Sequence, residues 1–143
     1  MKAIKVEVER SYVVRIFIVD DSAVIRSHLR EMLEQRSDWV VVGEACNGRD
    51  AVETLSDHKP DLTVMDFQMP EMDGLEAARR LTRKQPDVPI LMVTVDPSRQ
   101  LEVEAKKAGI KGLCPKAHMR CLLDAVEVLL KGQTYFPMDW GAA

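Results

Sequence analysis

The stretch LTVMDFQMPEMDG, residues 62–74, decides the fold of this chain. Its first four residues are apolar or β-branched, which predicts a strand buried on both faces, as in a parallel sheet. The strand ends abruptly in the carboxylate of Asp66, and a loop with turn-forming residues follows. An acid delivered to the carboxyl end of a buried strand is typical of α/β folds that bind ligands at that edge of the sheet.

Short apolar runs on either side of this stretch predict four more strands. They are expected at residues 13–19, 39–44, 90–95 and, more weakly, 112–114. Apolar stripes with helical spacing follow each strand and begin at Ile25, Ala51, Leu75, Leu101 and Leu122. Five strands alternating with five helices predict an α/β doubly wound fold, with a five-stranded parallel sheet, helices on both faces and right-handed crossovers.

The two ends of the chain are expected to lie outside this repeat. We predict an N-terminal extension over residues 1–12, one domain over residues 13–132 and a C-terminal tail or linker remnant over residues 133–143. Apolar and charged residues alternate between positions 4 and 9, so an extra edge strand is the alternative there. The tail is aromatic and is expected to lie on the body of the domain. We expect a stand-alone protein, the alternative being the excised part of a longer one.

The composition is that of an ordinary globular protein, which we expect to be cytoplasmic. Apolar residues make up 46% and charged residues 30% of the 143 residues, and the formal net charge is -3. This small negative charge disfavours direct nucleic-acid binding through the whole surface. No apolar run approaches the roughly 20 residues of a membrane span. The three cysteines show no paired or metal-binding spacing.

Polar side chains stand at the carboxyl ends of the predicted strands. The first strand ends in Asp20 and Asp21, the third in Asp66, the fourth in Thr94, and the fifth near Lys116. Each has an ordinary structural explanation by itself, and the acid pair in particular could simply cap a helix. No packing requirement explains the whole set at one edge of the sheet.

Three clustered carboxylates predict a divalent cation site, because they cannot all stay ionised without a cation. Mg²⁺ prefers oxygen ligands and usually binds through a few carboxylates, waters and a phosphate. Asp66 could then act as a nucleophile and form an acyl phosphate. Phosphoryl transfer needs mainly positioning and charge stabilisation, which Mg²⁺, Lys116 and the Thr94 hydroxyl would supply.

These residues resemble the response-regulator receiver family, the CheY-like phosphoacceptors of two-component signalling. The resemblance covers residues 14–131 and is most specific at IVDDS, residues 18–22, and MDFQMPEMDG, residues 65–74. It implies a flavodoxin-like strand order 2-1-3-4-5. It also implies that Asp66 is phosphorylated by a sensor histidine kinase or a histidine phosphotransfer protein.

The resemblance further assigns roles around Asp66. Asp21 and the backbone carbonyl of Gln68 would bind Mg²⁺ directly beside Asp66, and Asp20 would act largely through water. Thr94 and Lys116 would contact the phosphoryl oxygens. The signal would leave through a face formed by the fourth helix, the fifth strand and the fifth helix, toward a downstream protein partner.

Three positions depart from the family pattern. Leu113 stands where the fifth strand usually carries an aromatic switch residue. The usual Lys-Pro step is replaced by Lys116-Ala117, and we expect a trans bond, because a non-proline cis bond costs about 2.5–4 kcal/mol. Val95 is bulky where a small residue is usual, so we expect slower exchange at the site.

Two other functions fit the sequence less well. A haloacid-dehalogenase-like phosphatase needs a second acid two residues after the nucleophile, but Gln68 stands there and cannot act as a general acid. A receiver-like scaffold that is never phosphorylated would keep buried acids at a cost in stability. We therefore expect a non-enzyme that catalyses only its own phosphorylation and dephosphorylation, binds no membrane, and is compatible with a homodimer.

Overall fold

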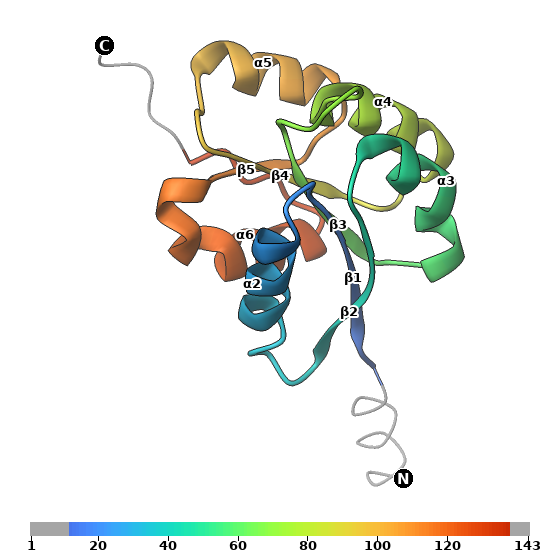
Figure 1. Cartoon of the computed structure of the whole chain (residues 1–143). Helices are drawn as coiled ribbons and strands as arrows, with labels where there is room; N and C mark the ends of the chain where they lie inside the picture. The colour runs from blue at the N-terminus through green and yellow to red at the C-terminus, as the bar shows by residue number, and fades with distance from the viewer. Residues whose placement is uncertain (1–11, 138–143) are drawn as a thin grey trace, which may run out of the picture.

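The computed structural model describes residues 12–137, and they form a parallel five-stranded sheet with helices on both faces (Figure 1). The strands run in the order β2-β1-β3-β4-β5, which confirms the predicted doubly wound topology. Their bounds are β1 (Val14–Val19), β2 (Trp39–Ala45), β3 (Leu62–Asp66), β4 (Ile90–Thr94) and β5 (Gly112–Pro115). The predicted edge strand at residues 4–9 lies outside the described residues. No helix of the described part has both the length and the apolarity of a membrane span.

One helix follows each strand, and side-chain caps fix where most of them begin. The helices are α2 (Ala23–Leu33), α3 (Gly48–His58), α4 (Gly74–Lys84), α5 (Arg99–Lys107) and α6 (Leu122–Leu130). In α2 to α5 the residue before the helix accepts a hydrogen bond from the backbone N–H three positions on, which satisfies one of the free donors of the first turn. These caps are Ser22, Asn47, Asp73 and Ser98.

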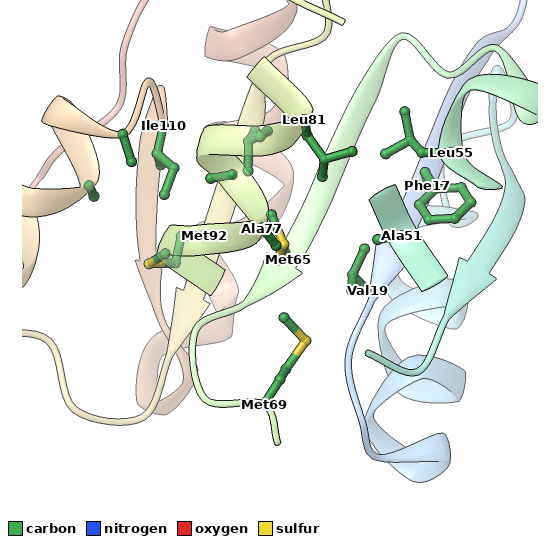
Figure 2. Close-up of a cluster of buried hydrophobic side chains, with 14 of the residues drawn as sticks. Phe17, Val19, Ala51, Leu55, Met65, Met69, Ala77, Leu81, Met92 and Ile110 are labelled. Carbon is green, nitrogen blue, oxygen red and sulfur yellow. The ribbon is translucent and has the colours of Figure 1, made fainter. Parts of the chain in front are cut away.

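Alternation along β1 divides the core between the two faces of the sheet. Phe17 and Val19 point toward α3, α4 and α5, where they pack with residues such as Leu55, Met65 and Leu81 (Figure 2). Ile16 and Ile18 point to the opposite face, which α2 and α6 cover. The strands are therefore largely apolar on both faces, with a few polar residues such as Thr63 within them, and the acids gather where the strands end.

The predicted strand limits differ from the observed ones by a single residue. The first strand begins at Val14, the second and fifth extend by one residue to Ala45 and Pro115, and the fourth stops at Thr94. After β5 the chain first forms the 3₁₀ helix η1 (Lys116–Cys121) and only then α6, a step that the sequence pattern did not predict.

The described part of the tail lies on the body of the domain, as its aromatic residues predicted. Tyr135 pairs in parallel with Gly112 at the outer edge of β5. Its N–H donates to the Lys111 carbonyl oxygen at 2.9 Å, and its carbonyl oxygen accepts from the Leu113 N–H at 2.9 Å. The segment thus occupies an edge that would otherwise leave these backbone groups unpaired.

A buried hydroxyl in β3 gives a test of the core. Thr63 is fully buried between Phe17 and Ile90, and its Oγ1 has no hydrogen-bond partner among the described residues. Because an unpaired buried hydroxyl keeps its desolvation cost, Thr63→Val should raise the free energy of unfolding by up to about 1 kcal/mol in urea denaturation. Thr63→Ala, which also removes the methyl group, should be less stable than Thr63→Val. A destabilised Thr63→Val would show that the hydroxyl has a partner.

Candidate acidic site at the carboxyl edge of the sheet

The three predicted carboxylates meet at one edge of the sheet. Asp20, Asp21 and Asp66 each offer an oxygen that lies within 4.8 Å of the other two. The register explains the meeting, because Val19 of β1 lies beside Met65 of β3, so the next residue of each strand ends at the same level. Asp20 and Asp66 are buried, and Asp21 is exposed. Two of the three acids are therefore shielded from solvent, and the third faces it.

Lys116, the first residue after β5, reaches the same cluster. Its Nζ lies 3.1 Å from Oδ1 of Asp66 and 3.3 Å from Oδ2 of Asp20. Its side chain is only 18% exposed, so these ion pairs are partly shielded from solvent. The Lys116-Ala117 bond is trans, as predicted, since the described residues contain no cis peptide. The single ammonium of Lys116 is thus ion-paired with two buried carboxylates.

The other predicted residues are Thr94, Val95, Leu113 and Gln68, and the backbone of Gln68 contacts Asp66. Thr94 ends β4 and is buried, and its hydroxyl accepts a hydrogen bond from the Asp96 N–H at 3.2 Å. Val95, the next residue, is 59% exposed, and Leu113 is fully buried in β5. Gln68 is exposed, and its backbone N–H donates to the Asp66 carboxylate. Because the Thr94 hydroxyl is the acceptor in this bond, it can still donate its own proton to a group on Asp66.

Gly74 shapes the loop that follows Asp66. Its N–H donates to the Phe67 carbonyl oxygen at 2.8 Å, which closes the loop over residues 67–74. A Cβ added at this position would lie 2.6 Å from the Asp66 carbonyl oxygen, so only glycine allows the first turn of α4 to approach β3 this closely. The loop thus holds Asp66 from its C-terminal side.

The electrostatics of the cluster show an excess of negative charge. Burial, and then the charge of Asp20, raise the pKa of Asp66, although Lys116 and the Gln68 N–H oppose the shift. Burial alone would lower the pKa of Lys116, but Asp20 and Asp66 outweigh it and raise that pKa. The Lys116 shift, and the part of the Asp66 shift that comes from Asp20, both arise because one lysine does not neutralise the acids. A divalent cation would fit this donor set.

Two features near the acids were missed or misjudged from the sequence. The alternative that the Asp20-Asp21 pair caps the following helix is wrong, because Ser22 is the cap of α2 and its N–H donates to Asp20 Oδ1 at 2.9 Å. Serine is a favoured capping residue, so the sequence offered that signal. Arg26 binds the Asp20 backbone carbonyl, and no sequence pattern indicated this contact.

A family model described as "Response regulator receiver domain" matches residues 16–127. The chain is 35% identical over 127 residues to the response regulator UvrY of Escherichia coli strain K12, covering 88% of this chain and 58% of that protein. It is 37% identical over 102 residues to the chemotaxis protein CheY of Thermotoga maritima, covering 71% and 84%.

Two further proteins are similar to this chain. A protein-glutamate methylesterase/protein-glutamine glutaminase of Alkalilimnicola ehrlichii is 44% identical over 106 residues, which are 72% of this chain and 27% of that protein. This chain therefore spans only part of several curated relatives that it matches. A crystal structure of a LuxR-family two-component response regulator from Aurantimonas sp. superposes with a TM-score of 0.83 at 30% identity, covering 86% of this chain and 89% of that one.

The raised pKa of Asp66 makes stability depend on pH. Its pKa lies above the ordinary 3.8 in the folded state, so the folded chain is favoured below that ordinary value and loses this stability as the pH rises through the raised pKa. Asp66→Asn removes the charge and should raise the free energy of unfolding of the metal-free protein at neutral pH. The gap should close as the pH falls below the ordinary value.

Urea denaturation in the presence of a chelator, repeated across the acidic and neutral range, measures this gap. Asp73→Asn is the matched control, because Asp73 caps α4 outside the cluster and asparagine caps equally well. An Asp66→Asn protein that is less stable than the wild type at neutral pH would show that Lys116 outweighs burial and Asp20.

Proposed function

This chain belongs to the response regulator receiver domain family, and on that premise we propose that it is a phosphorylation-dependent switch whose phosphoacceptor is Asp66. The observation that carries the proposal is the convergence of Asp20, Asp21, Asp66 and Lys116 at one edge of the sheet. Two-component signalling is the class of process in which such domains act. The phosphodonor would be a sensor histidine kinase or a histidine phosphotransfer protein.

The donor set supports a Mg²⁺ site. Asp21, Asp66 and the backbone carbonyl of Gln68 would hold the ion directly, and Asp20 would act largely through water. The observation that supports this fit is the meeting of three carboxylates within 4.8 Å of one another, and burial followed by the charge of Asp20 raises the pKa of Asp66 there. When bound, the ion supplies charge neutralisation for the carboxylates and for the oxygens of the incoming phosphoryl group.

Asp66 and Lys116 would have separate roles in the transfer of the phosphoryl group. A carboxylate oxygen of Asp66 forms a bond to phosphorus while the bond from phosphorus to the donor imidazole nitrogen breaks, and the electron pair stays on that nitrogen. Lys116 already lies at 3.1 Å from Asp66, so its ammonium can follow the charge onto a phosphoryl oxygen. Side chains around Asp66 leave it only 5% exposed, which limits the access of water to the acyl phosphate.

Phosphorylation would change the contacts of β4 and β5. The added group carries about -1.5 to -2 charge and strong acceptor oxygens. The Thr94 hydroxyl, which accepts from the Asp96 N–H, would donate its own proton to a phosphoryl oxygen, and turning toward that oxygen would alter the start of the loop between β4 and α5. Lys116 is the first residue of η1, so its movement toward the phosphoryl group would change the backbone where β5 joins η1. The face formed by α5, β5 and α6 would transmit these changes to a downstream protein, with the buried Leu113 responding by packing.

The remaining expectations are proposals of the same kind. The domain would be cytoplasmic and would process no substrate other than its own phosphoryl group. The dehalogenase-like alternative is not favoured, because Gln68, two residues after Asp66, cannot donate a proton as a general acid.

Incubation with Mg²⁺ and a small acyl phosphate should attach one phosphoryl group to the chain, detected by intact-mass spectrometry as an adduct that is acid-stable and base-labile. Asp66→Asn should abolish the adduct, because the nucleophile is gone. Asp73→Asn, a control aspartate seven residues further on, should retain it. An adduct on Asp66→Asn at full yield, or none on the wild type, would defeat the proposal.

Val95 offers a test of access to the acyl phosphate. This bulky residue directly follows Thr94, and we expect it to restrict the approach of water to the phosphorylated Asp66. Val95→Ala should therefore lose the adduct several times faster than the wild type. Such an increase corresponds to a barrier to hydrolysis that is lower by less than about 1.4 kcal/mol. Val103→Ala, which truncates an exposed valine on α5, is the control. Equal decay rates for Val95→Ala and the wild type would refute the role of Val95.

A further inference from the structure

Arg26, at the fourth position of α2, holds the acidic loop from outside the carboxylate cluster. Its Nη1 donates to the backbone carbonyl oxygen of Asp20 at 2.6 Å. This carbonyl lies just past the end of β1, where the Asp20 N–H donates to the Ala45 carbonyl oxygen at 3.1 Å. Hydrogen bonds with a charged donor are stronger than neutral ones, so Arg26 is a firm tether for the loop.

Glu44 of β2 fixes the guanidinium of Arg26 in this orientation. Its Oε1 accepts from Arg26 Nε at 2.9 Å, and its Oε2 accepts from Arg30 Nε and Nη2 at 3.0 and 2.6 Å. Burial favours the neutral form of Glu44, but the hydrogen bonds from Arg30 and Arg26 outweigh it and lower its pKa. Glu44 therefore stays a carboxylate and directs the free edge of the Arg26 fork toward Asp20.

The other polar groups of Asp20 are also bound. Oδ1 accepts from the Ser22 N–H at 2.9 Å, and Oδ2 lies 3.3 Å from Lys116 Nζ. Repulsion among the three carboxylates, whose oxygens lie within 4.8 Å of one another, opposes this arrangement of the loop. Arg26 counteracts that repulsion from outside the cluster, because it is bonded to the backbone at the point where the loop begins.

We propose that Arg26, oriented by Glu44, is a positioning residue that keeps Asp20 and Asp21 turned toward Asp66 and thereby strengthens Mg²⁺ binding. This inference rests on the proposed function and adds a determinant of cation affinity to it. Arg26 achieves this although its own charge is positive. It contacts a backbone carbonyl and a carboxylate of β2, not the carboxylates that would bind the ion.

The sign of the effect separates positioning from simple electrostatics. If Arg26 acted only through its charge, its removal would tighten Mg²⁺ binding, because like charges repel. If it acts by positioning, its removal weakens binding. Residues that orient metal ligands typically contribute a factor of about 10–100 to metal affinity, so a loss of about tenfold is expected for Arg26→Ala.

Calorimetric titration of the full chain with Mg²⁺ alone measures this effect. Arg26→Lys keeps the charge but cannot bond Glu44 and the Asp20 carbonyl with one planar fork, so it should also weaken binding. Arg30→Ala is the matched control. It removes an equal charge and a partner of the same Glu44 from the same helix, but Arg30 does not touch Asp20. Its dissociation constant should equal that of the wild type or be smaller.

Hydrogen exchange of the metal-free protein gives a second readout that is independent of the ion. The Ser22 amide, which donates to Asp20 Oδ1, should exchange faster in Arg26→Ala and Arg26→Lys than in the wild type, but not in Arg30→Ala. Comparison at matched fractions of unfolded protein separates this local effect from global destabilisation.

Wild-type binding that Arg26→Ala and Arg26→Lys leave unchanged or tighten would overturn the inference and leave the proposed function standing. A wild type that binds no Mg²⁺ would defeat the proposed function, and this inference with it. Weakened binding by both Arg26 variants, with the Arg30→Ala control unaffected, would support it.

Discussion

The repulsion among three carboxylates held within 4.8 Å of one another is the constraint on which the rest of the structure depends. Two of them are buried, and the raised pKa of Asp66 reports the cost, which arises from burial and from the charge of Asp20. The parallel register of β1 and β3 imposes this proximity, since both strands end at the same level. Carboxylates held together in this way favour the binding of positive charge, and the single charge of Lys116 is too small to balance them.

Each element around the edge contributes to holding the acids in place. Gly74 lets α4 close against the end of β3, and Lys116 extends from the end of β5 to Asp20 and Asp66. Arg26 tethers the backbone of Asp20 from α2. Thr94 differs from these, because its hydroxyl is bonded to the Asp96 N–H and away from the acids. Lys116 and Arg26 therefore hold the acids before any phosphoryl group arrives, whereas the Thr94 hydroxyl is bonded to the loop that follows β4.

Much of this could be read from the residues in order. Buried parallel strands are nearly continuous apolar runs, so β3 and its terminal Asp66 were visible directly, and the other strands were predicted to within one residue at either end. The rule that strand ends meet at one edge was enough to gather Asp20, Asp21, Asp66 and Lys116. These predictions succeeded because strand period, burial and chain direction are local properties, and the doubly wound topology leaves few ways to arrange them.

The sequence by itself thus determined the parallel sheet and the identity of the clustered charges, while the strand order was implied by the resemblance to the receiver family. Only the tertiary structure decided which partners those charges have. Ser22 caps α2 instead of the acid pair, Glu44 meets Arg26 across 18 positions, and η1 intervenes before α6. Contacts of this kind depend on how α2 packs beside β2 and on the reach of long side chains. Neither of these produces a periodic pattern or a fixed spacing of residues in the sequence.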